Sequence, residues 1–140
     1  MSVPDDRDAA FERGLKRRRE ILGDEWVDRA LANRTAFNAD LQSLITRFAW
    51  NEIWTRPGLP DETRRLLVLA FTIALGRWEE FDLHFRAALD HGVPADTLKE
   101  VLLQSLVYCG VPAAHTAFNR AEAIMSQQSG GTTRSGGTTL

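Results

Sequence analysis

Glycines that can end a helix recur along this 140-residue chain and divide it into short segments. Gly23, Gly76, Gly92 and Gly110 each follow a run with helical periodicity. The last two open the same tripeptide, GVP, in which proline can enter the first turn of the next helix. Strand patterns are nearly absent. The sequence therefore predicts a single all-α domain of about six to seven helices.

The expected helices run over 5–23, 24–34, 36–54, 60–75, 77–91, 93–109 and 111–127. The fourth is apolar nearly all round after Leu66, which predicts the central buried helix. After Gln128 the sequence becomes SGGTTRSGGTTL, which cannot bury apolar surface. We expect a helical domain over 1–128 and a flexible Gly/Ser/Thr tail over 129–140.

Composition argues against several classes of protein. Hydrophobic residues make up 44% and charged residues 26% of the chain, as in ordinary globular proteins. The longest apolar run, LLVLAFTIALG, is too short to span a bilayer, and the N-terminus lacks the apolar core of a secretory signal. We expect a cytoplasmic protein that does not bind membranes. Cys109 is the single cysteine, which excludes an internal disulfide, and the net charge of -2 gives no global reason to expect nucleic acid.

A basic cluster in the first expected helix is the local exception. Arg13 and the run KRRR at 16–19 fit either a phosphate-binding patch or the basic end of a helix before Gly23. No aromatic residue interleaves with the cluster, as single-strand nucleic-acid binding would require. The helix-end interpretation is favoured.

The segment GRWEEFDLHFRAALDHG at 76–92 combines a core-forming pattern with ionisable side chains. A helical projection separates an apolar face (Trp78, Phe81, Phe85, Ala88 and Leu89) from a solvent face (Glu79, Asp82, Arg86 and Asp90). Glu80 and His84 lie one turn apart on the border, in line with Arg77 and His91. Glu80 can accept a hydrogen bond from His84 and raise its basicity, which suits general acid–base catalysis. The same pair also fits an ordinary helix-surface contact.

The other two histidines fit structural roles. His91 precedes Gly92, where a cation caps the C-terminal end of a helix. His115, in AAHTAF, is expected to pack in the core or at a subunit interface. The histidines and Glu80 offer no convincing third ligand, so no metal is predicted.

Two tryptophans, Trp50 and Trp54, lie one turn apart and are bracketed by four arginines: Arg47, Arg56, Arg64 and Arg65. Aromatic walls beside guanidinium groups suit a small anionic organic molecule, since arginine binds carboxylates through two parallel hydrogen bonds. The alternative is that the tryptophans are core or subunit contacts and the arginines are solvated. Arg56 is the favoured ligand because its loop is short and bounded by prolines.

The stretches AFNADLQSLITRFAWNEIWTRPGLPDETRRLLVLA and EEFDLHFRAALDHGVPADTLKEVLLQSLVYCGVPAAHTAF resemble the 4-carboxymuconolactone decarboxylase family. The resemblance covers about residues 10–126. Its most specific pieces are WTRPGLP, the E-x-x-x-H of Glu80 and His84, and YCGVPAA. The wider superfamily, which includes alkyl hydroperoxidase D, implies a helical fold that forms homo-oligomers, with hexameric rings among the decarboxylases. Its peroxidases use C-x-x-C-x-x-x-H, but Arg77 and Glu80 stand at the two cysteine positions, which disfavours thiol-dependent peroxide reduction.

The resemblance implies cofactor-independent decarboxylation of 4-carboxymuconolactone to β-ketoadipate enol-lactone in protocatechuate catabolism. The lactone ring accepts the electrons left by CO2, so no cofactor is needed. His84 would be the acid, oriented by Glu80. The implied substrate-binding residues are Arg56, then Arg47 or Arg77 for the spectator carboxylate, and Trp50, Trp54 and Phe81 as an apolar wall. A related lactone enzyme and a non-enzymatic oligomeric binding module stay open as alternatives.

Overall fold

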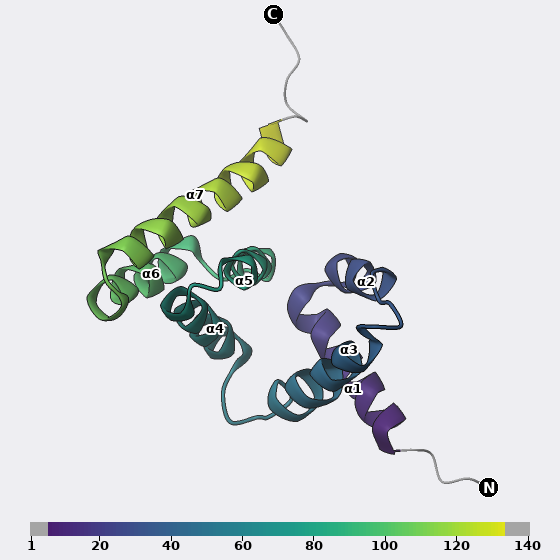
Figure 1. The fold of residues 1–140 in the computed structure, drawn as a ribbon. Helices are drawn as coiled ribbons and strands as arrows, with labels where there is room; N and C mark the ends of the chain where they lie inside the picture. The colour runs from purple at the N-terminus through teal and green to yellow at the C-terminus, as the bar shows by residue number, and fades with distance from the viewer. Residues whose placement is uncertain (1–5, 134–140) are drawn as a thin grey trace, which may run out of the picture. The chain divides into compact units, whose positions relative to one another are not determined.

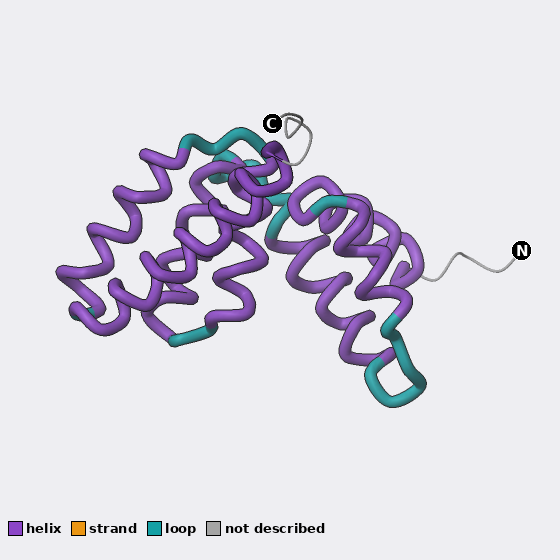
Figure 2. Tube along the Cα trace, turned by 90° about the horizontal axis from the view of Figure 1, so that it is seen from above, coloured by secondary structure: helices purple, strands orange, loops and turns teal. Residues whose placement is uncertain are grey.

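The structure is a computed structural model that describes the backbone of residues 6–133 and the side chains of residues 6–129. Every regular element in this range is a helix, so the all-α prediction is confirmed for the described residues (Figures 1 and 2). The elements are α1 (Asp6–Leu22), α2 (Asp24–Ala32), α3 (Ala39–Ile45), η1 (Thr46–Ile53), α4 (Asp61–Leu75), α5 (Trp78–Asp90), α6 (Ala95–Cys109) and α7 (Val111–Thr133).

Glycine ends the helices where the sequence predicts it. Gly23, Gly92 and Gly110 directly follow α1, the α5 cap and α6, and all three adopt a positive φ. An L side chain rarely adopts this conformation, which glycine reaches at little cost. His91 is the C-cap of α5, as predicted, and its Nδ1 lies 2.7 Å from the carbonyl oxygen of Ala87.

The chain divides into two compact units, one ending at Pro60 and the other beginning at Asp61. The first holds α1, α2, α3 and η1, and the second holds α4 to α7. A single domain over 1–128 stays a prediction. The predicted boundary after Gln128 falls inside α7, because small residues weaken a helix without ending it. The rest of the expected tail, 134–140, lies outside the described residues.

The first unit is built around the packing of α1 against η1. Gly14 of α1 is buried at this contact, and a Cβ atom there would collide with the backbone carbonyl of Thr46. The helix predicted over 36–54 changes at Thr46 from α to π geometry. The N–H of Trp54 therefore donates to the carbonyl of Ala49, five residues back, at 3.0 Å.

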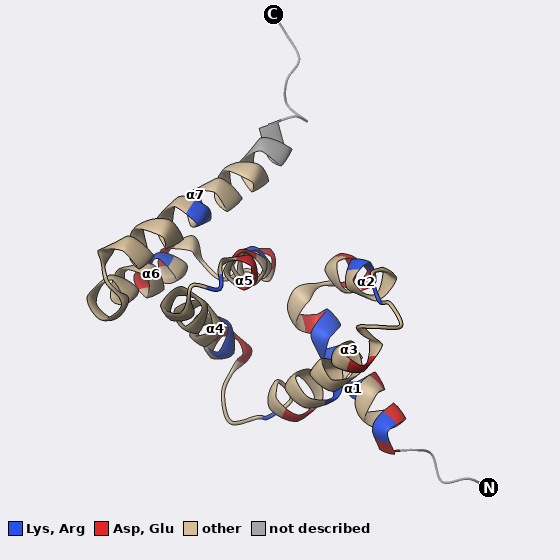
Figure 3. Cartoon of the chain, viewed as in Figure 1, with Lys and Arg blue, Asp and Glu red and all other residues tan. Residues whose placement is uncertain are grey.

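The basic cluster of α1 serves the first unit itself. Arg17 donates to the carbonyl of Trp54 at 2.9 Å, and Arg19 pairs with Asp28 at 2.8 Å. Arg18 is buried and lies over the ring of Trp26. It donates a hydrogen bond of 3.3 Å to the side-chain oxygen of Gln42. Figure 3 shows acidic residues beside the basic ones on α1. These contacts support a structural role for the cluster rather than a phosphate-binding patch.

The second unit encloses an apolar core between its four helices. The largest fully buried core side chains are Leu69, Ile73, Phe81, Phe85, Leu98 and Leu102. The prediction that the whole of α4 is buried is wrong. Leu67, Phe71 and Leu75 are 38%, 58% and 70% exposed, because only one face of α4 packs on its neighbours. Few charged side chains lie on α6 and on the described part of α7 (Figure 3).

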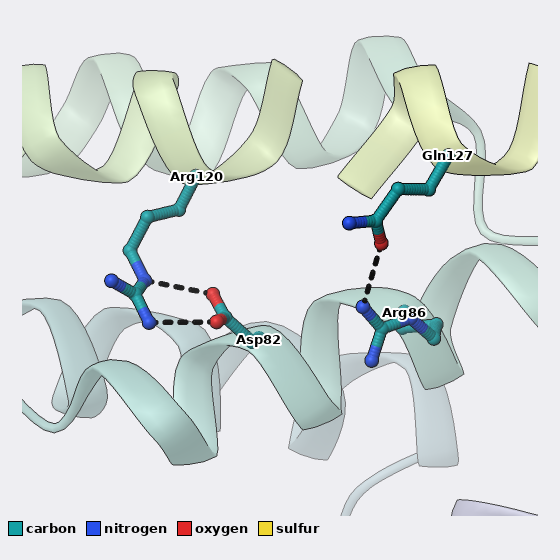
Figure 4. Close-up of polar contacts among 4 residues, drawn as sticks. All are labelled: Asp82, Arg86, Arg120 and Gln127. Carbon is teal, nitrogen blue, oxygen red and sulfur yellow. Dashed lines mark hydrogen bonds and ion pairs between the residues drawn. The ribbon is translucent and has the colours of Figure 1, made fainter. Parts of the chain in front are cut away.

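Ion pairing joins α5 to α7. Arg120 binds Asp82 through two hydrogen bonds of 2.9 and 2.7 Å, and Arg86 donates to Gln127 at 3.3 Å (Figure 4). The sequence places Asp82 on the solvent face, whereas it faces α7. The projection of one helix cannot show where the next helix lies.

Replacing Gly14 by alanine tests the α1–η1 packing. The added methyl group meets a backbone carbonyl that cannot rotate away, so the free energy of unfolding should fall by about 1–3 kcal/mol. Urea denaturation followed by tryptophan fluorescence measures the change. Gly58→Ala is the matched control, since no atom lies within 4 Å of the place that its methyl group would take. Equal stability of the two variants would contradict the packing described.

Candidate active site

His84 lies on the buried face of α5, 8% exposed, and not at the border that the sequence predicts. The helix also buries Phe81 and Phe85 on either side of it in sequence. Glu80, one turn earlier, is exposed, and Arg77 is the exposed N-cap before the helix. The exposed Glu80 and Arg77 thus face solvent, while the imidazole lies inside.

The predicted rise in the basicity of His84 is wrong in direction. Burial lowers the pKa of His84 to about 4, and the positive charge of Arg65 adds to the effect. Burial acts in this way because the imidazolium loses more hydration energy than the neutral ring. His84 is therefore neutral at pH 7 in the ligand-free protein. Its hydrogen bond to Glu80 stays a prediction.

Arg65, one of the four arginines around the two tryptophans in the sequence, adds the effect of its charge to that of burial in lowering the pKa of His84. It lies on α4 and is 3% exposed, on the same buried stripe as Leu69, Thr72 and Ile73. Arginine is almost never fully buried, so a prediction by residue type places it in solvent. The available signal was its phase, since Arg65 precedes Leu69 by four residues and Ile73 by eight.

Trp50 and Trp54 form an aromatic pair in the first unit. Their ring centroids are 5.1 Å apart and the rings are inclined by 21°, so they stack. Trp50 is buried and Trp54 is half-buried. The two residues lie about one turn apart along η1 and its C-cap, which brings the rings to the same side. The stacking agrees with the one-turn spacing in the sequence, and the role of the two rings as a wall for a ligand stays a prediction.

The three predicted arginines differ in their surroundings. Arg47 is half-buried and donates to the hydroxyl of Ser43 at 3.1 Å, whereas Arg56 and Arg77 are exposed. Arg47, Arg56 and both tryptophans belong to the first unit, while Arg77, Glu80, Phe81 and His84 belong to the second. The expectation that these two groups of residues line one site stays a prediction.

Phe81 does not form a wall that faces a ligand-accessible surface. Its side chain is fully buried, stacks on Phe85 at 5.5 Å and meets Trp78 edge-on at 5.6 Å. The apolar face of α5 is occupied by its neighbouring helices, which explains the difference. Phe81 is a core residue that supports the position of His84.

A groove of about 480 Å³ lies on the second unit between α4 and α6. Leu66, Val101, Tyr108 and Cys109 contribute to its lining, and it includes none of the predicted site residues. The groove is apolar and offers neither histidine nor arginine to an anionic substrate. We therefore place the candidate active site at His84 and not in this groove.

Among the described residues, no group of three or more histidine, cysteine, aspartate or glutamate side chains is arranged to hold a metal ion. No helix in the described range is long and apolar enough to cross a membrane. His115 is exposed on α7, so the predicted packing in the core is wrong and an interface role stays a prediction.

The chain belongs to the carboxymuconolactone decarboxylase family, whose model matches residues 39–123. This range contains every predicted site residue and Arg65. A 4-carboxymuconolactone decarboxylase of Acinetobacter baylyi is 46% identical over 114 residues, which are 81% of this chain and 85% of that protein. A nitrosuccinic acid decarboxylase of Metarhizium robertsii is 43% identical over 103 residues, 74% of this chain and 72% of its own.

The lowered pKa of His84 predicts a loss of stability in acid. The unfolded chain binds a proton at His84 near pH 6.5, whereas the folded chain binds it only near pH 4. As the pH falls through this window, the free energy of unfolding should drop by roughly 3 kcal/mol. His84→Gln should remove this part of the pH dependence in urea titrations.

The matched control leaves the buried ring of His84 in place: His115→Gln changes an exposed histidine on α7 and should keep the wild-type slope of stability against pH. An unchanged slope in His84→Gln would show that the imidazole is not buried as described.

Proposed function

We propose that this protein is a cofactor-independent carboxy-lyase that converts 4-carboxymuconolactone to β-ketoadipate enol-lactone and CO2 in protocatechuate catabolism. The observation that carries the proposal is the 46% identity, over most of the chain, to a relative named for this reaction. The geometry adds a buried imidazole within reach of the charge of a buried arginine. The cytoplasm is the proposed location, as the sequence predicts.

The reaction consumes one proton in each turnover. The carbon–carbon bond to the departing carboxylate breaks, and its electron pair spreads through the ring double bond into the lactone carbonyl. The resulting dienolate takes a proton at the carbon next to that carbonyl, which gives the enol-lactone. The protein has to supply the proton, bind the second carboxylate and leave the departing carboxylate in apolar surroundings.

His84 is the proposed proton donor. At neutral pH its buried ring lacks the second proton that an imidazolium would donate. The substrate carries two carboxylates, and negative charge next to a buried imidazole favours the imidazolium. Substrate binding therefore raises the pKa of His84, and the ring takes up the proton that it then delivers. Glu80 is the proposed orienting group.

The remaining proposed roles concern the spectator carboxylate and the departing one. Arg56, Arg47 or Arg77 binds the spectator carboxylate, and the stacked Trp50 and Trp54 provide apolar surroundings. The relative named for nitrosuccinic acid supports a substrate with two carboxylates. Nitrosuccinic acid also has two carboxyl groups and an electron-accepting group beside the one that can leave as CO2.

His84→Gln should lower kcat for 4-carboxymuconolactone by about 10²- to 10⁴-fold, because a positioned acid contributes on this scale. The lactone is generated in the cuvette, its loss is followed by ultraviolet absorbance and the product is identified by NMR. His91→Gln is the matched control and should retain wild-type turnover. Glu80→Gln should lower kcat less than His84→Gln, and Glu79→Gln controls for the charge.

Two results would contradict the proposal. Wild-type turnover by folded His84→Gln would remove the acid from this residue. Absence of lactone conversion by the wild-type protein would move the activity to another acid, of which nitrosuccinate is the first to assay, or to ligand binding without turnover.

We also propose that the protein forms a homo-oligomer, a hexamer by resemblance to its family. Apolar side chains are exposed on both units. Monomeric proteins rarely expose large contiguous patches of apolar side chains. On the first unit they recur with helical spacing: Phe37, Leu41, Leu44 and Phe48. On the second they lie on α4, on α6 and at the start of α7: Leu67, Phe71, Leu75, Leu103, Val107, Tyr108 and Val111.

Val107→Asp should shift the protein to smaller species in sedimentation velocity. Val107 is 70% exposed, so the substitution costs the isolated chain little but places a charge in an apolar contact. Lys99→Asp puts the same side chain at an exposed polar position of α6 and should leave the assembly unchanged. Sedimentation of the wild-type protein as a monomer would contradict the proposal.

A further inference from the structure

We propose that Arg65, buried on α4 beside His84, is the residue that binds a carboxylate of the substrate at the point of proton transfer. This inference rests on the proposed function for the identity of the substrate. It places Arg65 ahead of Arg56, Arg47 and Arg77 as the principal ligand of the spectator carboxylate.

Burial distinguishes Arg65 from the arginines that the sequence favours. Arg65 is 3% exposed, while Arg56 and Arg77 are exposed to solvent. Water weakens the attraction between an exposed guanidinium and a carboxylate, whereas the same pair interacts more strongly in a site of low dielectric constant. A buried guanidinium also keeps its charge, because arginine does not lose its proton in proteins.

The position of Arg65 relative to His84 provides the second argument. Arg65 begins the buried stripe of α4, His84 lies on the buried face of α5, and the two helices pack together. Burial lowers the pKa of His84, and the positive charge of Arg65 lowers it further. An anion bound to Arg65 therefore lies close to the proposed acid. It also offsets the positive charge that otherwise opposes protonation of the ring.

Arg65 and His84 together suit a substrate that is an anion and that accepts a proton during the reaction. The guanidinium offers two parallel donors to a carboxylate, which fix its orientation. The imidazole is the only other titratable side chain buried in the second unit among the described residues. A fixed positive charge and a proton-transfer group thus lie on two packed helices whose largest buried side chains are apolar.

The test separates binding from turnover by using succinate, a dicarboxylate that this chemistry does not decarboxylate. Its dissociation constant is measured by calorimetry for the wild-type protein and for Arg65→Gln and Arg65→Lys. Arg65→Gln should raise this constant, and KM for the lactone, about 10- to 100-fold. Arg65→Lys keeps the charge and should lose less. Arg86→Gln is the matched control, because Arg86 is exposed on α5 and bonds Gln127 (Figure 4).

NMR titration of His84 adds a readout that a merely structural role would not change. Removing the charge in Arg65→Gln should raise the pKa of the imidazole, whereas Arg86→Gln should not. In the wild-type protein, saturating succinate should shift both the imidazole resonances and the Nε–H resonance of Arg65. The last measurement needs no variant and decides the case even if neither substitution at Arg65 folds.

Three outcomes would overturn the inference. They are unchanged succinate binding in folded Arg65→Gln, no binding of succinate by the wild-type protein, and an unmoved Arg65 resonance at saturation. Failure of the proposed function looks different. The wild-type protein would then bind succinate through Arg65 and leave 4-carboxymuconolactone unconverted.

Discussion

Two basic side chains are buried in one pair of packed helices, and the proposed chemistry of the second unit depends on them. Arg65 and His84 occupy positions on α4 and α5 where the helical pattern would otherwise place apolar residues. The unit accommodates one buried positive charge, and arginine holds its proton more firmly than histidine. Burial lowers the pKa of His84 and keeps its imidazole neutral, and the charge of Arg65 adds to the effect. Any negative charge that enters the site shifts this balance toward a second proton.

Membership of the carboxymuconolactone decarboxylase family is consistent with such an arrangement. A decarboxylase whose substrate accepts electrons itself needs little from the protein beyond placement of charge and one proton. Stacked Phe81 and Phe85 anchor the buried face of the helix that carries His84, and the bidentate pair of Arg120 and Asp82 joins that helix to α7. The proposed acid thus belongs to a helix that is held on more than one side.

Much of the fold was predictable, because helix ends leave local signals. Gly23, Gly92 and Gly110 mark helix ends by residue type alone, and acidic residues mark the starts of α1 and α4. The site was less predictable. His84 and Arg65 are polar residues whose type favours solvent, and only the helical phase of Arg65 indicated that it is buried. The exposed face of α4 was not predicted, because its apolar residues have the same composition as a buried face.

The π geometry of η1 depends on how many residues this segment holds as well as on which residues they are. A π turn holds more residues than an α turn, so the segment from Thr46 to Ile53 carries the equivalent of an inserted residue. Deleting one residue there would allow a regular α-helix to form without breaking the chain. The side chains beyond the deletion would then keep their places around the helix axis, because the extra residue and the wider turn are lost together. Relatives that differ by one residue in this segment therefore still present corresponding faces beyond it.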